Sequence, residues 1–457
     1  MNDLLDHSAN RALVLAGGGM RVAYQAGILM ALSEAGYQFN HVDGTSGGIF
    51  NTAMLASGLD SRNIAERWRT LNIKWFNSLR AFKNYLKPFK MQGYADADNI
   101  RDKVFPHMGI DFDKIKQSPY SYNFNVCNFS KKSVETIAQD QVTREHLLAG
   151  VSLPILMPAL KIGDDWYIDA VWVKDANVLH ASRKGVKEIW LVWAIGNNHH
   201  YLNGAFNQYV HMIEMSAGGA LLQEFDHIKS APELDVKLHV LKPDFPLPLD
   251  PDLFFNKIDA RSLINMGYAD AKNYLKEMKA EGVPMDESAT KMKEPGTRLN
   301  IHAGFNGMIE WKGQLQLGEV FCYYRLSKID GELFLKLFGS LRVGEEEYPF
   351  YQTNTAIAEV NGIRYLISKG SLTIEGEGKQ VIMKVKAPGA FDAMIGLSFK
   401  EAELEIGAGA QSMSTIKMTQ SIGSRLKNAF RMNVLTAEGT HGSFSTKFNM
   451  INQLQEI

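Results

Sequence analysis

Three short segments of the sequence hold the residue types that acyl-transfer chemistry needs. A glycine triplet occupies residues 17–19, Ser46 lies in the Gly-x-Ser-x-Gly pattern of residues 44–48, and Asp169 ends an apolar run. A serine hydroxyl becomes a nucleophile when a nearby base takes its proton, and a carboxylate can be that base. The N–H groups of a glycine turn can stabilise the oxyanion that forms when the serine attacks a carbonyl group.

The pattern around Ser46 predicts a nucleophile elbow. A very short strand at Val42 precedes it, and a helix is predicted to follow through Leu55. In such a strand–turn–helix unit the serine occupies a tight turn, and Gly44 and Gly48 leave the approach to it open. The same five residues also fit an ordinary glycine–serine turn, so the pattern taken alone leaves both interpretations open.

The candidate base follows a predicted pair of strands at residues 159–162 and 166–168. Asp164, Asp165 and Asp175 are its rivals. The first two lie in the turn between the strands, where aspartate usually serves the turn itself and is solvated. Asp169 is the candidate base, and Asp175 stays open as a rival.

The glycine triplet also permits a different function, because a glycine turn before a helix binds phosphate groups as readily as an oxyanion. A dinucleotide-binding domain needs the pattern Gly-x-Gly-x-x-Gly and an acidic residue at the end of the second strand. Val22 stands where the last glycine would be, whereas Asp43 lies near the acidic position. A nucleotide-binding module therefore stays open as an alternative.

Taken in order, these segments resemble the patatin-like phospholipase family. The matching features are GGGMR at 17–21, the A-Y-Q-A-G-x-L helix that follows, the elbow at 44–48, the segment from Ser152 to Pro158 with the spacing S-x-x-P-x-x-x-P, and the late aspartate. The resemblance covers about residues 11–285. It implies an α/β fold, a three-layer sandwich with a mainly parallel central sheet.

The resemblance also implies roles for single residues. Ser46 would be the nucleophile and Asp169 the base of a Ser–Asp dyad, with Gly17, Gly18 and Gly19 as the oxyanion loop and Arg21 as the family's arginine. The implied activity is a serine carboxylic-ester hydrolase acting on acyl lipids, of the phospholipase A, lysophospholipase or acylglycerol esterase type. Neither a cofactor nor a metal ion is implied.

Two positions depart from the family pattern. Ala170 follows the aspartate where the family has glycine, and Val22 follows the arginine where a glycine is usual. The first departure supports a third interpretation, a catalytically silent lipid-binding protein that keeps the fold.

The predicted elements divide the chain into parts. An N-terminal tail at 1–10 precedes the patatin-like domain at 11–285, where strands and helices alternate. A charged stretch at 286–298 is predicted to be a linker. Residues 299–457 show short alternating runs with turn signals, typical of an all-β sandwich or barrel. Its role does not follow from its residues.

Residues 67–90 combine seven basic side chains with six aromatic ones and contain no acidic residue. Trp75, Phe76 and Phe82 in this segment are candidates for a lid or a membrane-contacting surface. The competing interpretation is a surface helix that packs its aromatic side chains on the core.

Composition limits the remaining possibilities. The 457 residues have a formal net charge of -1, so no general attraction to nucleic acid is expected. Two widely separated cysteines, Cys127 and Cys322, fit a reducing compartment. No apolar signal region and no spanning segment is recognised, so a cytoplasmic protein with peripheral membrane contact is expected. His199, His200 and His211 match no metal-ligand spacing.

Overall fold

The structure, a computed structural model, describes residues 3–76, 78–79, 95–196, 203–294, 296–387, 399–407, 414–436, 441–443, 445–447 and 449–451. The chain divides into two compact units. The first contains Met1–Phe254 and Tyr274–Lys293, and the second contains Phe255–Asn273 and Glu294–Ile457. Among the described helices, none has the length and apolar character needed to cross a bilayer.

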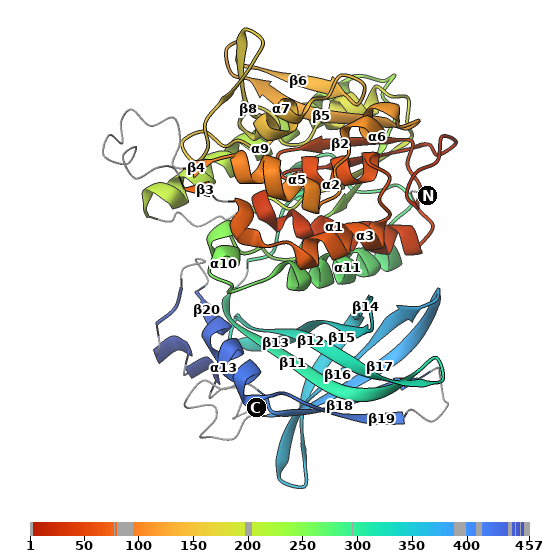
Figure 1. The fold of residues 1–457 in the computed structure, drawn as a ribbon, viewed down its shortest axis with the longest axis vertical. Helices are drawn as coiled ribbons and strands as arrows, with labels where there is room; N and C mark the ends of the chain where they lie inside the picture. The colour runs from red at the N-terminus through yellow and green to blue at the C-terminus, as the bar shows by residue number, and fades with distance from the viewer. Residues whose placement is uncertain are drawn as a thin grey trace. The chain divides into compact units, whose positions relative to one another are not determined.

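The first unit is built on a mixed, mostly parallel sheet (Figure 1), whose strands run in the order β10-β9-β1-β2-β5-β8-β7, with β6 also paired to β5. The five strands from β10 to β5 are parallel, and β6, β7 and β8 add antiparallel pairs. Their bounds are β1 Arg11–Leu15, β2 His41–Thr45, β5 Ser121–Asn128, β6 Ser133–Ala138, β7 Leu160–Ile162, β8 Asp165–Asp169, β9 Glu188–Val192 and β10 Lys237–Leu241. The predicted α/β fold with a mainly parallel sheet is confirmed.

Helices cover both faces of this sheet, because β1 and β9 carry buried apolar residues on both sides. Alternate residues of β1 point to opposite faces. Ala12 and Val14 pack in one core cluster with residues of α8 Val178–Ser182 and α9 Ala205–Ser230. The opposite face is covered by α1 Ala23–Glu34, α2 Gly48–Ala56 and α3 Ser61–Thr70, which lie side by side in Figure 1.

Shorter helices complete the first unit. They are the 3-10 helices η1 Gly19–Val22, η2 Ile73–Phe76, η5 Ala170–Trp172 and η6 Glu287–Ala289, the π-helix η4 Ile100–Val104, and α5 Phe105–His107, α6 Phe112–Gln117, α7 Arg144–Gly150 and α10 Asp250–Phe254. The chain after the glycine triplet therefore begins with a 3-10 turn and becomes α-helical at Ala23.

The second unit is an antiparallel sheet of ten strands that is nearly closed. It also contains residues 260–273 of α11 Ala260–Glu277 and the helix α13 Ile422–Arg431, which packs on the sheet. The strands follow the order β14-β13-β12-β11-β19-β18-β17-β16-β15, and β20 also pairs with β11. Their bounds are β11 Thr297–Trp311, β12 Gln314–Ile329, β13 Glu332–Val343, β14 Glu346–Pro349, β15 Tyr351–Val360, β16 Ile363–Ile374, β17 Glu377–Lys386, β18 Glu401–Gly407, β19 Ser414–Thr419 and β20 Asn433–Leu435. This confirms the predicted all-β fold of the C-terminal part.

Tight hairpins set the register of this second sheet. Two-residue turns with positive φ at both positions match the right-handed twist of the strands that they join. Asp330 and Gly331 adopt φ values of 52° and 87° between β12 and β13, and Asn361 and Gly362 adopt 53° and 73° between β15 and β16. Turns of this kind agree with the all-β fold predicted for residues 299–457.

The two compact units divide the chain differently from the predicted domain ranges. Residues 255–273, which include most of α11, group with the second unit. Within the stretch predicted as a linker, Ala289 and Met292 are buried in a core cluster of the first unit, and β11 begins at Thr297. Independent folding of the predicted ranges remains a prediction, because compactness does not test it.

Candidate active site

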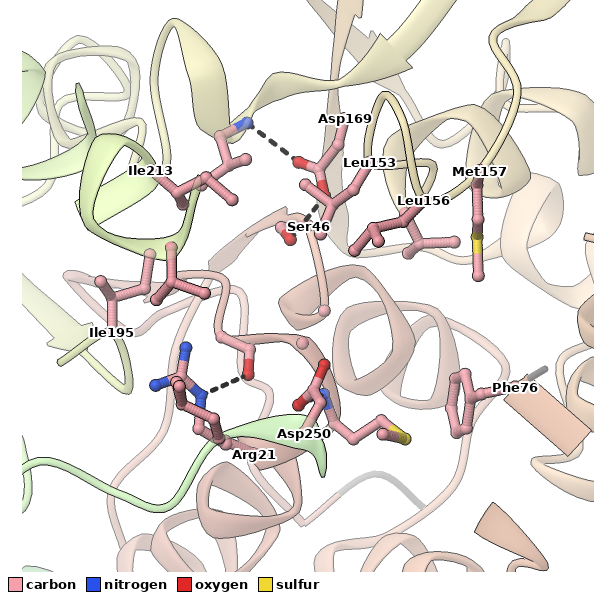
Figure 2. A pocket seen from close by; sticks show the side chains of 18 of the residues that line it. Arg21, Ser46, Phe76, Leu153, Leu156, Met157, Asp169, Ile195, Ile213 and Asp250 are labelled. Carbon is pink, nitrogen blue, oxygen red and sulfur yellow. Dashed lines mark hydrogen bonds between the residues drawn. The ribbon is translucent and has the colours of Figure 1, made fainter. Parts of the chain in front are cut away.

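Ser46 occupies the turn between β2 and α2, as the elbow pattern predicts. Its φ is 51°, in the left-handed region, which costs a non-glycine residue of order 1–3 kcal/mol unless the surroundings hold it. Its side chain is buried, and its Oγ donates a hydrogen bond of 2.7 Å to Oδ2 of Asp169. Figure 2 shows the two side chains directed at each other.

Glycines next to Ser46 allow three chain segments to meet at this turn. A Cβ atom on Gly44 would overlap Oγ1 of Thr52, and one on Gly48 would overlap the carbonyl oxygen of Leu15 at the end of β1. A Cβ atom on Gly47 would overlap the carbonyl oxygen of Gly19. The elbow therefore needs glycine at these positions for close packing.

The sheet register explains why Asp169 reaches Ser46 from far along the chain. Strand β5 lies between β2 and β8. Thr45 at the end of β2 pairs with Asn125, and Asp169 at the end of β8 pairs with Val126, the next residue of β5. Ser46 and Asp169 therefore lie close together, on the two sides of β5, although they are far apart in the chain.

The Asp169 carboxylate is fully buried and has two hydrogen-bond donors. Oδ1 accepts from the backbone N–H of Val171 at 2.9 Å, and Oδ2 accepts from Ser46. Ala170, which replaces the family's glycine, is buried and begins η5 without a positive φ. The backbone here does not need glycine, so the substitution leaves the carboxylate in place.

Burial raises the pKa of Asp169 from 3.8 to about 7. Removal from water disfavours the charged form, while the hydrogen bonds from Ser46 and Val171 partly offset that effect. A base with a pKa near neutrality can both accept and release a proton at physiological pH.

Two further buried carboxyl groups hold the glycine loop, and no sequence motif indicates this role for either of them. Oδ2 of Asp175 accepts from the N–H of Gly17 at 2.9 Å, and Oδ1 of Asp250 accepts from the N–H of Met20 at 3.0 Å. Burial raises the pKa of both carboxyl groups, and the Asp169 charge raises that of Asp175 further. From the sequence, Asp175 is only a rival of Asp169 as the base, and Asp250 lies in no recognisable motif.

These contacts decide which amides of the loop remain available. Within the described part of the chain, the N–H groups of Gly18 and Gly19 make no hydrogen bond, whereas that of Gly17 is taken by Asp175. Arg21 is buried, and its Nε donates to the carbonyl oxygen of Gly18 at 2.9 Å, which orders the loop (Figure 2). Gly18 and Gly19 are thus the candidate oxyanion donors, and Gly17 anchors the loop.

A cavity of about 410 Å³ opens on Ser46 and Asp169. Most of its wall is apolar, as Figure 2 shows for Leu153, Leu156, Ile195 and Ile213. Small-molecule sites usually enclose roughly 300–1,000 Å³ with a few polar groups in an apolar wall. The polar side chains in this wall are those of Arg21, Ser46, Asp169, Tyr209, Glu214 and Asp250, so a mostly apolar space surrounds the reacting centre.

The aromatic segment at 67–90 is described only as far as Phe76 and at residues 78–79. Phe76 has 7% of its side chain exposed, stacks on Trp68 and lines the cavity. Trp75 is half-buried against His107. These contacts favour the packing interpretation for Phe76, and Phe82 lies outside the described residues.

The nucleotide-binding alternative needs Asp43 to reach a ribose. Asp43 is fully buried, and its Oδ1 accepts a hydrogen bond from Asn125. A group enclosed in this way cannot contact a ligand without rearrangement, so the geometry favours the hydrolase interpretation.

Comparison with known proteins agrees with this architecture. Residues 13–181 match the family model described as patatin-like phospholipase. Together with the mostly parallel sheet and the elbow, the match shows that the first unit contains a patatin-like phospholipase domain, which confirms the resemblance seen in the sequence. The C-terminal part lies outside the match.

Curated relatives with similar sequences are lysophospholipases. The protein named lysophospholipase nte1 of Aspergillus oryzae is 25% identical over 305 residues, which are 62% of this chain and 19% of that protein. Lysophospholipase nte1 of Aspergillus terreus shows the same identity and coverage. The chain therefore spans about a fifth of the length of these relatives.

Among solved structures, VipD from Legionella pneumophila matches with a TM-score of 0.33 and 11% identity, over 59% of this chain and 67% of that chain. A likeness at this level carries no conclusion about function.

The raised pKa of Asp169 predicts how its replacement changes stability. Between pH 3.8 and about 7 the folded chain holds a proton on this carboxyl that the unfolded chain has lost, so wild-type stability falls as pH rises through that window. Raising the pKa of Asp169 from 3.8 to about 7 corresponds to a loss of about 4 kcal/mol of folding stability at most. Asp169→Asn should therefore unfold at a higher temperature than wild type at pH 8, with a smaller difference at pH 4.

Calorimetry at the two pH values measures this difference. Asp164→Asn is the control, because that side chain lies in an exposed turn and should leave the unfolding temperature unchanged at both. A difference for Asp169→Asn that is equal at pH 4 and pH 8 would contradict a raised pKa.

Proposed function

We propose that the chain is a lipid acyl hydrolase in which Ser46 is the nucleophile and Asp169 the general base. The proposal rests on the hydrogen bond of 2.7 Å between Ser46 Oγ and Asp169 Oδ2 at the end of an apolar cavity. The phospholipase family match and the lysophospholipase names of the relatives support an ester of a lipid as substrate. Lysophospholipids, phospholipids and acylglycerols are the candidate classes.

The reaction follows from the hydrogen-bond directions. Ser46 Oγ attacks the ester carbonyl carbon while its proton moves to Asp169, and the carbonyl oxygen becomes an oxyanion facing the N–H groups of Gly18 and Gly19. When the tetrahedral intermediate collapses, the C–O bond breaks and the proton from Asp169 goes to the leaving alcohol. Water then attacks the acyl-serine and gives a proton to Asp169, and the fatty acid leaves with Ser46 reprotonated.

Each oxyanion donor contributes a recognisable share of such a mechanism. Loss of one preorganised donor in serine proteases lowers kcat by about 10²–10³-fold. Here the two amides are backbone groups, and their orientation depends on the anchors at Gly17 and Met20. Asp175 and Asp250 are therefore positioning residues, and neither is proposed to touch the substrate.

Membrane contact is proposed through α9, which forms one wall of the cavity. Phe206, Tyr209 and Ile213 of this helix line the cavity. On the same helix Phe206, Met212 and Met215 are 41%, 47% and 70% exposed. Exposed apolar side chains at the wall of a lipid site suit contact with the acyl region of a bilayer.

The cellular location is proposed on different grounds. Both cysteines, Cys127 and Cys322, are buried and free. Free thiols persist in reducing compartments such as the cytoplasm, which supports a location at membranes facing that compartment.

Covalent labelling tests the nucleophile. A fluorophosphonate probe should label the wild-type chain at Ser46, because the probe mimics an ester and traps an activated serine. Ser46→Ala should lose labelling, and Asp169→Asn should hydrolyse a short-chain ester about 10³-fold more slowly or worse. Ser57→Ala, which removes another buried serine, is the control and should leave labelling intact. A folded wild-type chain that takes no label would favour the silent lipid-binding alternative.

The pKa of Asp169 sets the expected pH profile. Only the ionised carboxylate accepts the serine proton, so kcat/KM for a neutral soluble ester should rise about tenfold per pH unit below about 7 and level above it. Stopped assays between pH 5 and 9 measure the profile. A rate that is flat from pH 5 upward would mean that the base has an ordinary carboxyl pKa or is another group.

Vesicle binding tests the membrane surface of α9. Met212→Asp with Met215→Asp should weaken co-sedimentation with phospholipid vesicles, since both side chains are exposed, while hydrolysis of a soluble short-chain ester stays close to wild type. Leu315→Asp, at another exposed apolar residue in the second unit, is the matched control. Unchanged vesicle binding in the double variant would exclude this surface.

A further inference from the structure

A second cluster of chemically active side chains lies in the first unit and takes no part in the proposed hydrolysis. His41 and Asp43 stand two residues apart on β2 and so project to the same face of the sheet. His180 comes from α8. One ligand-type atom from each of the three residues lies within 4.8 Å of those of the other two.

The polar atoms at the centre of this cluster have no hydrogen-bond partner. His41 and Asp43 have side chains with 1% and 0% exposure, and their facing atoms, His41 Nε2 and Asp43 Oδ2, lie 3.8 Å apart. That separation is too long for a hydrogen bond. Neither atom has any partner in the described part of the chain. An unpartnered buried carboxylate oxygen is costly, so something else is expected to satisfy it.

Strand β5 contacts all three side chains. His41 Nδ1 lies 2.8 Å from Ser121 Oγ, and Asp43 Oδ1 accepts from Asn125 Nδ2. His180 Nε2 accepts a hydrogen bond of 2.7 Å from Asn123 Nδ2, which an ion bound to this nitrogen would displace. Ser121, Asn123 and Asn125 are alternate residues of β5 and therefore lie on one face. Metal-binding histidines and carboxylates are typically oriented by outer hydrogen bonds of the kind that Ser121 and Asn125 make.

We propose that His41, Asp43 and His180 form a binding site for a divalent transition-metal ion, with Zn²⁺ as the best fit. Two imidazoles and one carboxylate are a usual donor set for zinc, with a fourth position left for solvent. With bond lengths near 2.0–2.1 Å, tetrahedral ligand atoms lie roughly 3.3–3.5 Å apart. The facing atoms of His41 and Asp43 are 3.8 Å apart and the three ligand-type atoms lie within 4.8 Å of one another, so the side chains must close by up to about 1.5 Å around an ion. His180 is half-buried, whereas His41 and Asp43 are buried.

The position of the site defines its role. Asp43 lies three residues before Ser46 on the strand that carries the nucleophile turn, and His180 lies on a helix that packs against β1 and β9. A bound ion would tie that helix to β2 and neutralise the buried Asp43 charge. The role is structural, and the proposal stands independently of the hydrolase activity.

Metal analysis of the full, untagged chain tests the site. After dialysis against EDTA, addition of Zn²⁺ and removal of the excess by gel filtration, mass spectrometry should find one zinc per chain. Co²⁺ in its place should give the visible absorption bands of a tetrahedral cobalt site. Zinc should also raise the unfolding temperature of the metal-free chain.

Variants locate the ion. His180→Gln should weaken zinc binding by at least about 10–100-fold and remove the thermal shift. His227→Gln is the matched control, because that histidine is exposed on the neighbouring helix α9. Asp43→Asn serves as a second variant if His180→Gln does not fold. Less than 0.1 zinc per chain in wild type, or stoichiometric zinc that both variants retain, would overturn the proposal.

Discussion

The removal of the Asp169 carboxylate from water is the constraint on which the rest of the site depends. In the described part of the chain the carboxylate accepts hydrogen bonds from the Ser46 hydroxyl and the Val171 N–H. In water it would ionise near pH 4 and would be a weak base, whereas burial raises its pKa to about 7. Burial also strengthens the electrostatic interaction of the carboxylate with the Ser46 hydroxyl.

Holding such a group in place requires a rigid frame, and the parallel sheet supplies it. The frame fixes the ends of β2 and β8 on the two sides of β5, so the serine and aspartate meet without help from a mobile loop. The strained φ of Ser46 survives because Gly47 and Gly48 pack directly against backbone atoms of other segments. Strain at the nucleophile and close packing around it are two aspects of one arrangement.

The glycine loop shows how buried charge can organise backbone. Asp175 and Asp250 each accept one N–H of the loop, and Arg21 donates to the carbonyl oxygen of Gly18 between these two contacts. Burial raises the pKa of both carboxyl groups, and the Arg21 charge partly offsets that rise. These contacts of Asp175, Asp250 and Arg21 leave the N–H groups of Gly18 and Gly19 available, within the described residues, for an oxyanion. On the other side of the nucleophile strand, β5 supplies a row of polar side chains to His41, Asp43 and His180. The central strands of this unit therefore carry two separate polar centres within an apolar sheet.

The local motifs could be predicted from the sequence. The glycine triplet and the Gly-x-Ser-x-Gly turn are recognisable because a tight turn needs particular residue types at particular spacings. The turn residues around Gly331 and Gly362 are typical of antiparallel hairpins for the same reason. Features that depend on contacts between distant segments have no comparable pattern in the sequence. Asp250, the pairing of α11 with the second unit, and the meeting of His41 with His180 follow from sheet order and packing, which bring together residues whose separation in the chain carries no pattern. Neighbouring residues determine short-range geometry, whereas burial and long-range contacts arise only when the whole sheet has formed.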